Sequence, residues 1–251
     1  MRLLFCIVLM ALTGCVTIVT RAGGKRAPGA DVHEAHGFII LNGERTAVKW
    51  SDGDSFDFES GPYDGQGTRL FGYNTLESYG PVHRWGDWTR EELYTLTKGD
   101  SDVCASQEWE CTTSGAPDAY GRVLVECPKL AIEMARQGRG LAYAIRGKPN
   151  RLVLDAMHQA QRARRGIWAK GVPKGLITAL HSFAENTDGK YTTSSNRILD
   201  TRTGEAPLRK HTDYYQLCEE VCLRTEGDWS CMVYVPYELR YKNQPPCLIG
   251  E

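Results

Sequence analysis

Two carboxylates and two arginines in the first half of the chain could together act on a phosphodiester. Asp54 and Glu77 offer oxygen ligands of the kind that hold a hard cation such as calcium, and Asn74 can add a neutral carbonyl oxygen. Arg69 and Arg122 carry planar guanidinium groups whose N–H donors match phosphate oxygens. A metal, a carboxylate and two arginines supply what phosphodiester hydrolysis requires: charge neutralisation, a positioned water and stabilisation of the growing negative charge.

Each of these signals also has a purely structural interpretation. The tripeptide Asp52-Gly53-Asp54 is typical of a hairpin turn. Arg69 could pair with Glu77, and Tyr120-Gly121-Arg122 could be the start of a strand with an exposed charge. Three arginines near the end of the last predicted helix are expected to favour the helix dipole rather than to contact nucleic acid: Arg162, Arg164 and Arg165.

Five segments, in this order, resemble the staphylococcal nuclease (thermonuclease) family. They are VKWSDGDSF, TRLFGYNTLES, YGRVLVE, MARQGRGLAYA and the helix end RRGIW. The resemblance covers residues 44–170 of the 251 and includes the distances between the motifs. It implies a Ca2+-dependent enzyme that cuts DNA and RNA with little sequence preference, by attack at phosphorus on the 5′-oxygen side, and leaves 3′-phosphate products.

The resemblance also implies roles for individual residues. Asp54 matches the family's first calcium-ligating aspartate, and Thr75 matches the residue that lends its backbone carbonyl to the metal. Glu77 matches the glutamate that orients or deprotonates the attacking water. Arg69 and Arg122 match the two arginines that hold the scissile phosphate. Two tyrosines match residues that line the nucleotide pocket: Tyr120 and Tyr143.

Two positions depart from the family pattern. Asn74 stands where the family has a second calcium-binding aspartate. An amide in place of a carboxylate removes one negative charge from the metal shell, so we expect weaker binding of Ca2+, which millimolar calcium outside a cell tolerates. Ala119 stands where a lysine often precedes the tyrosine, so we expect a less basic nucleotide pocket.

The pattern around these residues predicts a small barrel. Short apolar or alternating runs separated by turn residues are expected to be strands at 38–42, 45–50, 55–59, 68–73, 102–111 and 122–126. Cap and stop residues predict helices at 87–98, 128–138 and 152–164. We therefore expect an α+β fold, in which residues 38–170 form a five-stranded OB-type β-barrel with three packed helices.

Residues 171–251 differ in composition from the preceding segment. Residues 186–204 are polar and turn-rich, and 214–248 are dense in Cys and Tyr, so we expect a small Cys-rich C-terminal extension beside the barrel or wrapped on it. Cys218 and Cys222 could share one helix face, but no CxxC pair or His cluster accompanies them, which favours disulfide bonds over a zinc site. Seven cysteines follow residue 15, so one thiol is left free or pairs between chains.

The N-terminal sequence MRLLFCIVLMALTGC is typical of a secretory signal, with an early positive charge, an apolar run and small residues before Cys15. We expect residues 1–14 to be a signal peptide, and Leu12-Thr13-Gly14-Cys15 resembles a bacterial lipobox that directs lipidation of Cys15. Residues 15–37 are then the lipidated N-terminus and a flexible tether. The alternative is an uncleaved membrane anchor, because the uncharged segment 3–20 is almost long enough to span a bilayer. Either reading predicts export, and the first predicts a membrane-anchored lipoprotein of the bacterial cell envelope.

Composition narrows the function classes. With 41% hydrophobic and 24% charged residues the chain can bury a core and is not a disordered protein. Its formal net charge of −1 excludes the global basicity of a histone, so affinity for DNA or RNA must come from a local site. The leading hypothesis is a nuclease. A non-catalytic module that binds nucleic acid or an envelope component, and a structural lipoprotein without a ligand, are the alternatives, and no protein partner can be inferred.

Overall fold

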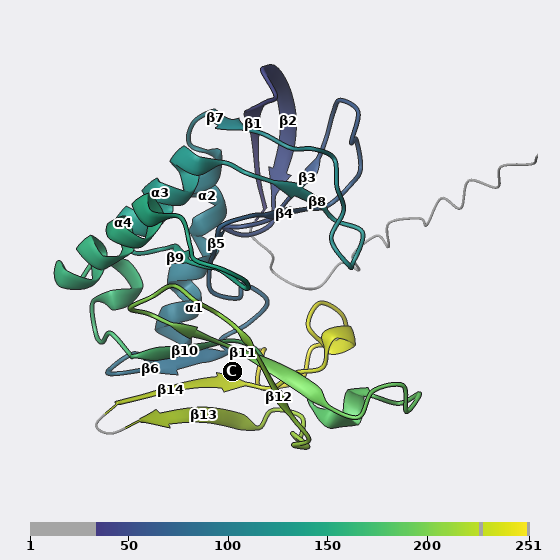
Figure 1. The fold of residues 1–251 in the computed structure, drawn as a ribbon, viewed down its shortest axis with the longest axis vertical. Helices are drawn as coiled ribbons and strands as arrows, with labels where there is room; N and C mark the ends of the chain where they lie inside the picture. The colour runs from purple at the N-terminus through teal and green to yellow at the C-terminus, as the bar shows by residue number, and fades with distance from the viewer. Residues whose placement is uncertain (1–33, 226–227, 250–251) are drawn as a thin grey trace, which may run out of the picture.

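The computed structural model describes residues 34–225 and 228–249, and of Thr225 only the backbone. The predicted signal peptide, the lipidation site Cys15 and most of the predicted tether lie outside these residues. The described chain is a mixed α+β protein, with strands gathered at two ends and helices α2, α3 and α4 along one side between them (Figure 1).

One end is a four-stranded sheet in the order β3-β2-β1-β7. A hairpin joins β1 (Ala35–Leu41) to β2 (Glu44–Trp50), and β3 (Phe56–Phe58) continues the antiparallel meander. The hairpin turn is Asn42-Gly43, with φ of +50° and +90°, which is the backbone that an Asn-Gly pair adopts most readily. β7 (Trp109–Cys111) runs parallel to β1. Pairing of β1 with β2 starts at Ala35, so the last three residues of the expected tether segment are already part of the sheet.

Two short ladders stand beside this sheet. β4 (Thr68–Leu70) pairs in parallel with β8 (Val123–Val125), and β5 (Tyr73–Asn74) pairs antiparallel with β9 (Leu141–Ala142). The strands of the described residues therefore form open sheets and not one closed barrel. Two isolated bridges connect the neighbouring edges: Asp57 with Gly67, and Thr112 with Glu126.

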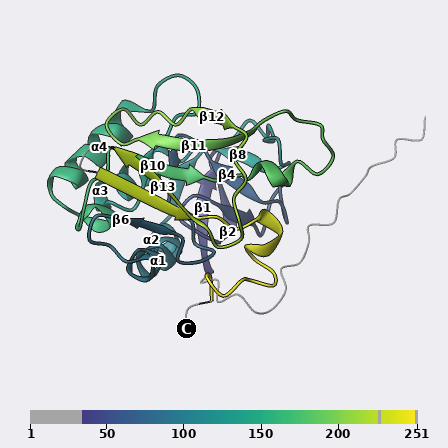
Figure 2. The same cartoon turned by 90° about the horizontal axis from the view of Figure 1, so that it is seen from below.

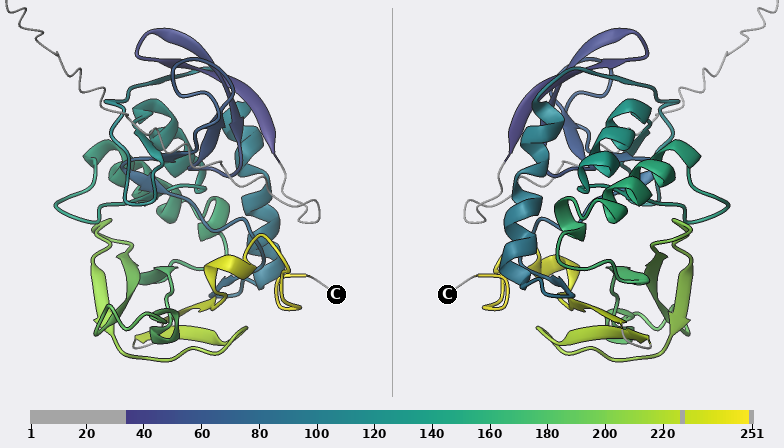
Figure 3. Two further views of the ribbon diagram at one scale, coloured as in Figure 1. Left: turned by 90° about the vertical axis from the view of Figure 1, so that its right-hand side faces the viewer. Right: turned by 90° about the vertical axis from the view of Figure 1, so that its left-hand side faces the viewer.

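The helix predicted at 87–98 is present, and a second helix follows it where the start of a strand was expected. α1 (Arg90–Lys98) begins at a capping box in which Thr89 and Glu92 exchange hydrogen bonds, two residues after the expected cap at Asp87. Gly99 ends α1, and α2 (Asp100–Ala105) follows it in nearly the same direction, as one column in Figure 3. The prediction of a strand over 102–111 was thus wrong for its first half. Asp100 and Asp102 favour a helix N-terminus, and α2 packs on β1 and β2, which overrides the local alternation.

The other two helices were predicted correctly. α3 (Pro128–Gln137) starts with proline in its first turn and ends at Gly138, whose φ of +71° is the left-handed conformation of a helix stop. α4 (Arg151–Arg162) starts at Asn150, whose side chain accepts from the backbone N–H of Leu152.

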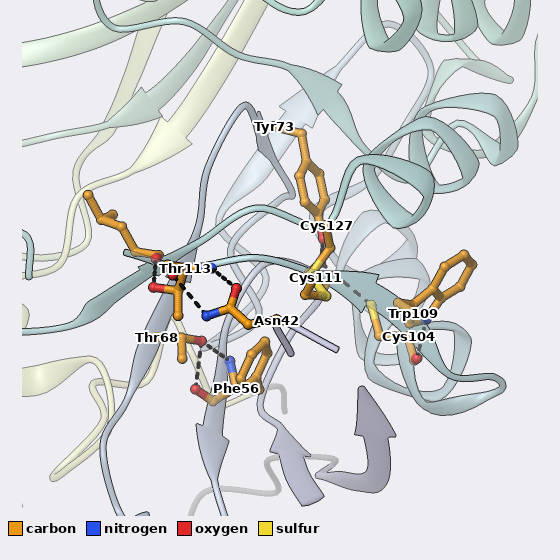
Figure 4. Close-up of a disulfide and its surroundings, with 11 residues drawn as sticks. Asn42, Phe56, Thr68, Tyr73, Cys104, Trp109, Cys111, Thr113 and Cys127 are labelled. Carbon is orange, nitrogen blue, oxygen red and sulfur yellow. Dashed lines mark hydrogen bonds between the residues drawn. A yellow bond between two sulfur atoms is a disulfide. The ribbon is translucent and has the colours of Figure 1, made fainter. Parts of the chain in front are cut away.

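Three disulfide bonds account for six of the cysteines, which confirms the expectation of disulfides. Cys111–Cys127 ties the end of β7 to the start of α3, next to the reciprocal bonds between Asn42 and Thr113 and beside Tyr73 and Trp109 (Figure 4). Cys218–Cys247 and Cys222–Cys231 both lie in the C-terminal extension, so neither Cys218 nor Cys222 is available to zinc. Neither residue lies in a helix. Cys104 is the free thiol of the described residues, and it is buried.

The C-terminal extension adds two three-stranded sheets. One contains β10 (Gly175–Ala179), β11 (Ser194–Asp200) and β12 (Leu208–His211), in that order. The other contains β13 (Glu220–Thr225) and β14 (Asp228–Val233). Its third strand, β6 (His83–Trp85), comes from residues 38–170, which we call the nuclease-like segment after the resemblance of the motifs within it. Seen from below, β10 lies beside β13 (Figure 2), and β10 also contacts β14.

Both hydrophobic clusters combine residues of the extension with residues of the nuclease-like segment. The larger cluster holds Trp50, Trp85 and Trp168, and it includes Leu176 and Leu199 of the extension. The smaller cluster joins residues near β6 to the extension: Tyr79 and Val82 with Ile177, Leu180, Met232, Val233, Tyr234, Val235 and Leu248. Each large apolar side chain buried in this way stabilises the fold by about 1.5–3 kcal/mol. Among the described residues, no helix has the length and apolarity needed to cross a membrane.

Candidate functional site

Asp54 is aimed into the protein by the turn between β2 and β3. The Asp52 carboxylate accepts hydrogen bonds from the backbone N–H of Asp54 (3.0 Å) and from the Ser55 hydroxyl (2.8 Å). Asp54 is only 2% exposed, and its Oδ2 accepts from the backbone N–H of Thr75 at 2.8 Å. The Asp-Gly-Asp segment is therefore a turn, as its structural interpretation predicts, and this turn also places a carboxylate in the interior.

Gly53 allows this turn to pack closely. A Cβ at this position would lie 2.6 Å from Thr75 Cγ2 and 2.9 Å from Met134 Cε, which leaves room for glycine alone. The Tyr73 hydroxyl donates to the Gly53 carbonyl. The turn is thus fixed against β5 and α3.

Arg69 bridges the two expected side-chain metal ligands. From β4, its guanidinium donates one N–H to Asp54 Oδ1 and another to Asn74 Oδ1. The Asn74 amide in turn donates to the backbone carbonyl of Thr75 at 2.7 Å. The alternative ion pair between Arg69 and Glu77 is not formed, since Arg69 pairs with Asp54. Burial would lower the pKa of Arg69, but the charges of Asp54 and Asp52 raise it above the ordinary value, so this arginine is a permanent cation.

Two buried carboxyl groups near this turn have raised pKa values. Burial, together with the charge of Asp54, raises the pKa of Asp52 to about 7. Burial likewise raises the pKa of Asp100 to about 7, although Arg139 Nη1 lies 2.5 Å from its Oδ1. The site therefore contains more acidic groups than the sequence motifs indicate.

The donor set of Asp54, Asn74 and Thr75 fits a hard cation in kind, because all three offer oxygen atoms. In the structure these oxygens already accept hydrogen bonds from Arg69, Thr75 or Asn74. An ion between Asp54 and Asn74 therefore requires the guanidinium to move aside. The group with metal-like spacing among the described residues is elsewhere, at Glu220, Cys222 and Cys231, and its two cysteines are joined in a disulfide.

Glu77 follows β5 and is half-buried. Its backbone N–H donates to His83 Nε2 at 3.3 Å, which requires a neutral His83, and burial lowers the pKa of that imidazole to about 4. Burial raises the pKa of the Glu77 carboxyl, and the positive charge of Arg240 opposes this rise. Asp54 raises the pKa of Glu77 further, and Arg69 and Arg122 lower it by smaller contributions. All three charges therefore lie near Glu77.

Arg122 is held by a carboxylate that sequence reasoning missed. Asp118 Oδ2 accepts from Arg122 Nε at 2.9 Å and Nη2 at 2.7 Å, and Asp118 Oδ1 accepts from the backbone N–H of Tyr120 and Arg122. The spacing of four residues between Asp118 and Arg122 was the available signal. Arg122 directly precedes β8, so the strand-start interpretation also holds. Tyr120 is 80% exposed, and its ring centroid lies 5.5 Å from Arg122 Cζ.

Four of the predicted site residues line one cavity, whose volume of about 660 Å3 is typical of ligand pockets. Arg69, Arg122, Tyr120 and Tyr143 all line it. Asp54, Asn74 and Thr75 do not line it but lie directly behind Arg69, and Glu77 does not line it either. The cavity also has walls that the motifs did not indicate: Phe71, Ile145, Arg146, Lys148 and Arg197.

No protein-family model and no curated protein matches this sequence.

Proposed function

We propose that this chain is an exported, Ca2+-dependent nuclease of the thermonuclease type, an endonuclease that hydrolyses phosphodiester bonds of DNA and RNA with low sequence specificity. The observation that carries the proposal is the shared cavity. Arg69 of β4, Arg122 directly before β8 and two tyrosines line it, and a buried carboxylate lies behind Arg69. Such a set suits a phosphodiester flanked by bases.

The proposal extends to the fold. We propose that six strands, and not the five expected from the sequence, form an OB-type barrel whose two seams are reduced to single bridges: β1, β2, β3, β4, β7 and β8. Support comes from the order of the edges: the bridge of Thr112 with Glu126 links the ends of β7 and β8, and the bridge of Asp57 with Gly67 links β3 to the start of β4. Short seams of this kind leave a mouth at which loops can bind a nucleic acid strand.

In this mechanism the arginines bind the substrate. Each guanidinium has five N–H donors, so Arg122 can donate to phosphate oxygens while it keeps Asp118, and Arg69 can donate to them once it has moved aside from Asp54 and Asn74. Glu77 takes the proton of the attacking water, and a pKa raised by burial makes it a better base near neutral pH. Asp54, Asn74 and Thr75 would hold Ca2+, which supplies charge neutralisation at the phosphate when it is bound.

Cleavage of single-stranded DNA by the full chain tests this proposal. We expect activity with calcium and none with EDTA, and Glu77→Gln lowers the rate by about 10²–10⁴-fold because it removes the base. Glu110→Gln serves as a matched control, since Glu110 is an exposed carboxylate that pairs with Lys129 and neither residue lines the cavity. Activity that is independent of calcium, or equal in the two variants, contradicts the proposal.

A second candidate is a module that binds nucleic acid without cutting it. The contact that favours it is the Arg69 guanidinium between Asp54 and Asn74, because it occupies oxygens that a metal would need. Binding of single-stranded DNA with no turnover at any calcium concentration would select this function.

We also propose that the chain is a lipoprotein of the bacterial envelope, attached to the membrane through Cys15. Three disulfides in the described residues support an oxidising compartment. Mass spectrometry of the mature N-terminus tests it: a diacylglyceryl group on Cys15 is expected, and its absence from a membrane-extracted chain contradicts the assignment.

A further inference from the structure

The cavity has one wall that comes from the C-terminal extension. Arg197 of β11 lines the cavity together with Arg69, Arg122 and Tyr143. The Thr178 hydroxyl donates to the backbone carbonyl of Arg197 at 3.4 Å and lies 3.2 Å from the Tyr143 hydroxyl oxygen. Because Thr178 has one hydroxyl hydrogen, Tyr143 is the donor in the second contact. β11 is therefore bonded to the cavity wall through β10.

The loop after β9 belongs to the same wall. Ala144 donates its N–H to the Gly204 carbonyl at 2.8 Å and accepts from the N–H of Ala206 at 2.8 Å, which ties the loop to the turn before β12. This loop brings Arg146 and Lys148 to the cavity, and both are exposed. Within the described residues neither has a carboxylate at ion-pair distance.

The register of β11 and β12 decides which side chains share the face of Arg197. Ser195 lies opposite Lys210, and residues directly opposite in an antiparallel pair point to the same face. Ser195 and Arg197 are two residues apart in one strand and also share a face. Lys210 therefore lies on the same face as Arg197, toward the exposed end of the hairpin.

Arg209 lies on the opposite face. It is paired with Asn196, whose side chain donates to the Tyr215 hydroxyl at 2.8 Å and accepts from the backbone N–H of His181 at 3.1 Å. Two adjacent cations of β12 are thus separated by the pleat of the strand.

Two cations of the extension, Arg197 and Lys210, differ from the arginines of the cavity in their pairing. Among the described residues, no ion pair includes Arg197 or Lys210, whereas Arg69 and Arg122 each have an aspartate. A group of uncompensated cations in a chain of net charge −1 attracts an extended polyanion locally. Exposed aromatic rings on the same cavity, Phe71 at 60% and Tyr120 at 80%, offer surfaces for unpaired bases, which favours single-stranded nucleic acid over other polyanions.

We propose that Arg197 and Lys210 form a phosphate-binding surface for single-stranded polynucleotide that continues from the cavity onto β11 and β12. This inference rests on the proposed function in so far as the cavity binds nucleic acid, but it does not require cleavage. The extension then binds phosphates beyond the one at Arg69 and Arg122, so the protein prefers polymers to short fragments.

The test is binding of a fluorescein-labelled oligothymidylate of about 20 nucleotides, longer than one OB-type site covers, to the full chain in EDTA over a range of salt concentrations. Each phosphate contact contributes about 0.7 to the slope of log K against log salt for single strands. We expect Lys210→Gln to lower the slope by about 0.7 and Arg197→Gln with Lys210→Gln by about 1.4. Arg209→Gln is the matched control, with the same charge loss one residue away on the other face, and leaves the slope unchanged.

The outcomes separate this inference from the proposed function. Equal slopes for the natural chain, Lys210→Gln and the double variant overturn the inference and leave the nuclease proposal intact. Equal losses in Lys210→Gln and Arg209→Gln also overturn it, since they would reflect net charge rather than a surface. Failure of the natural chain to bind the oligonucleotide in EDTA overturns the inference, whereas the nuclease proposal is decided separately by cleavage in the presence of calcium. A reduced slope without any calcium-dependent cleavage supports the surface and selects the binding module.

Discussion

The two regions that meet at the cavity hold their charged groups in different ways. In the nuclease-like segment the key cations are compensated: Arg69 by Asp54 and Arg122 by Asp118. In the extension, Arg197 and Lys210 have no such partners among the described residues. Paired arginines are fixed in position before any ligand arrives, which suits a reacting phosphate. Unpaired cations on a strand suit the looser recognition of a polymer backbone.

The regions also differ in how they are held together. The nuclease-like segment supplies most of the larger hydrophobic cluster and one disulfide, whereas the extension has two disulfides. Small sheets bury little apolar surface alone, and covalent cross-links compensate for that.

The largest effect is expected from removing a buried carboxylate. Asp54→Ala leaves the mostly buried Arg69 guanidinium without its anion, and we expect a loss of about 3–5 kcal/mol in the free energy of unfolding. Asp118→Ala is the control within the same region, because Arg122 is 39% exposed and its pair contributes about 1 kcal/mol or less. Urea denaturation in EDTA measures both. Similar losses in the two variants would mean that pairing is not what fixes Arg69.

A slightly smaller effect is expected from the disulfides of the extension. Replacing Cys218 and Cys247 by serine opens a link of sequence separation 29, and the chain-entropy relation gives a loss of about 3.5 kcal/mol. The link between Cys222 and Cys231 spans 9 residues, so its removal costs about 2.5 kcal/mol. Denaturant unfolding of both double variants measures the difference. If neither variant loses stability, the packing of the extension suffices without its cross-links.

The third experiment asks whether the extension affects the chemistry at Glu77. Arg240 lowers the pKa of Glu77 against the effect of burial, and a base acts when deprotonated, so activity rises with pH through that pKa. Arg240→Met should move the acid limb of the pH–rate profile to higher pH, because the variant lacks the charge that lowers the pKa of Glu77. Arg240→Lys keeps the charge and should keep the limb in place. If the acid limb does not move in Arg240→Met, the extension does not influence the reaction at Glu77.

The smallest effect is expected at the departure from the family pattern. Asn74→Asp adds a carboxylate to the expected metal ligands, so half-maximal cleavage should need about 3–10-fold less calcium. Asn186→Asp makes the same change at a residue that is not one of the expected metal ligands, and it should leave the calcium titration unchanged. If both titrations coincide with that of the natural chain, Asn74 does not limit metal binding.

Local patterns predicted the local elements. Pro128 at the start of α3 and Gly138 at its end restrict the backbone by themselves, and the helix predicted between them is present. The turn between the strands predicted at 38–42 and 45–50 is also present, but it starts at Asn42, which was predicted as the end of a strand. The prediction of a strand over 102–111 was wrong at its start, where α2 continues to Ala105. Cys104 of this helix is buried, and α2 packs against β1 and β2, so these tertiary contacts favour a helix there.

Contacts between distant segments could not be predicted in this way. β6 pairs with β14 across most of the chain, and Arg197 reaches the cavity because β11 is held against Tyr143 by Thr178. The gathering of Arg69 and Arg122 was predicted through the family resemblance and not through spacing. The carboxylate partner of Arg122 at Asp118 needed only a local pattern, and it was still missed.

The buried thiol of Cys104 has a practical consequence. It donates to the Gly53 carbonyl beneath the turn that carries Asp54, and solvent does not reach it in the folded chain. A thiol reagent can modify it only when α2 separates from β1, so the alkylation rate reports how often this part of the molecule opens. The protein therefore carries its own reporter of local unfolding, placed directly under the candidate site.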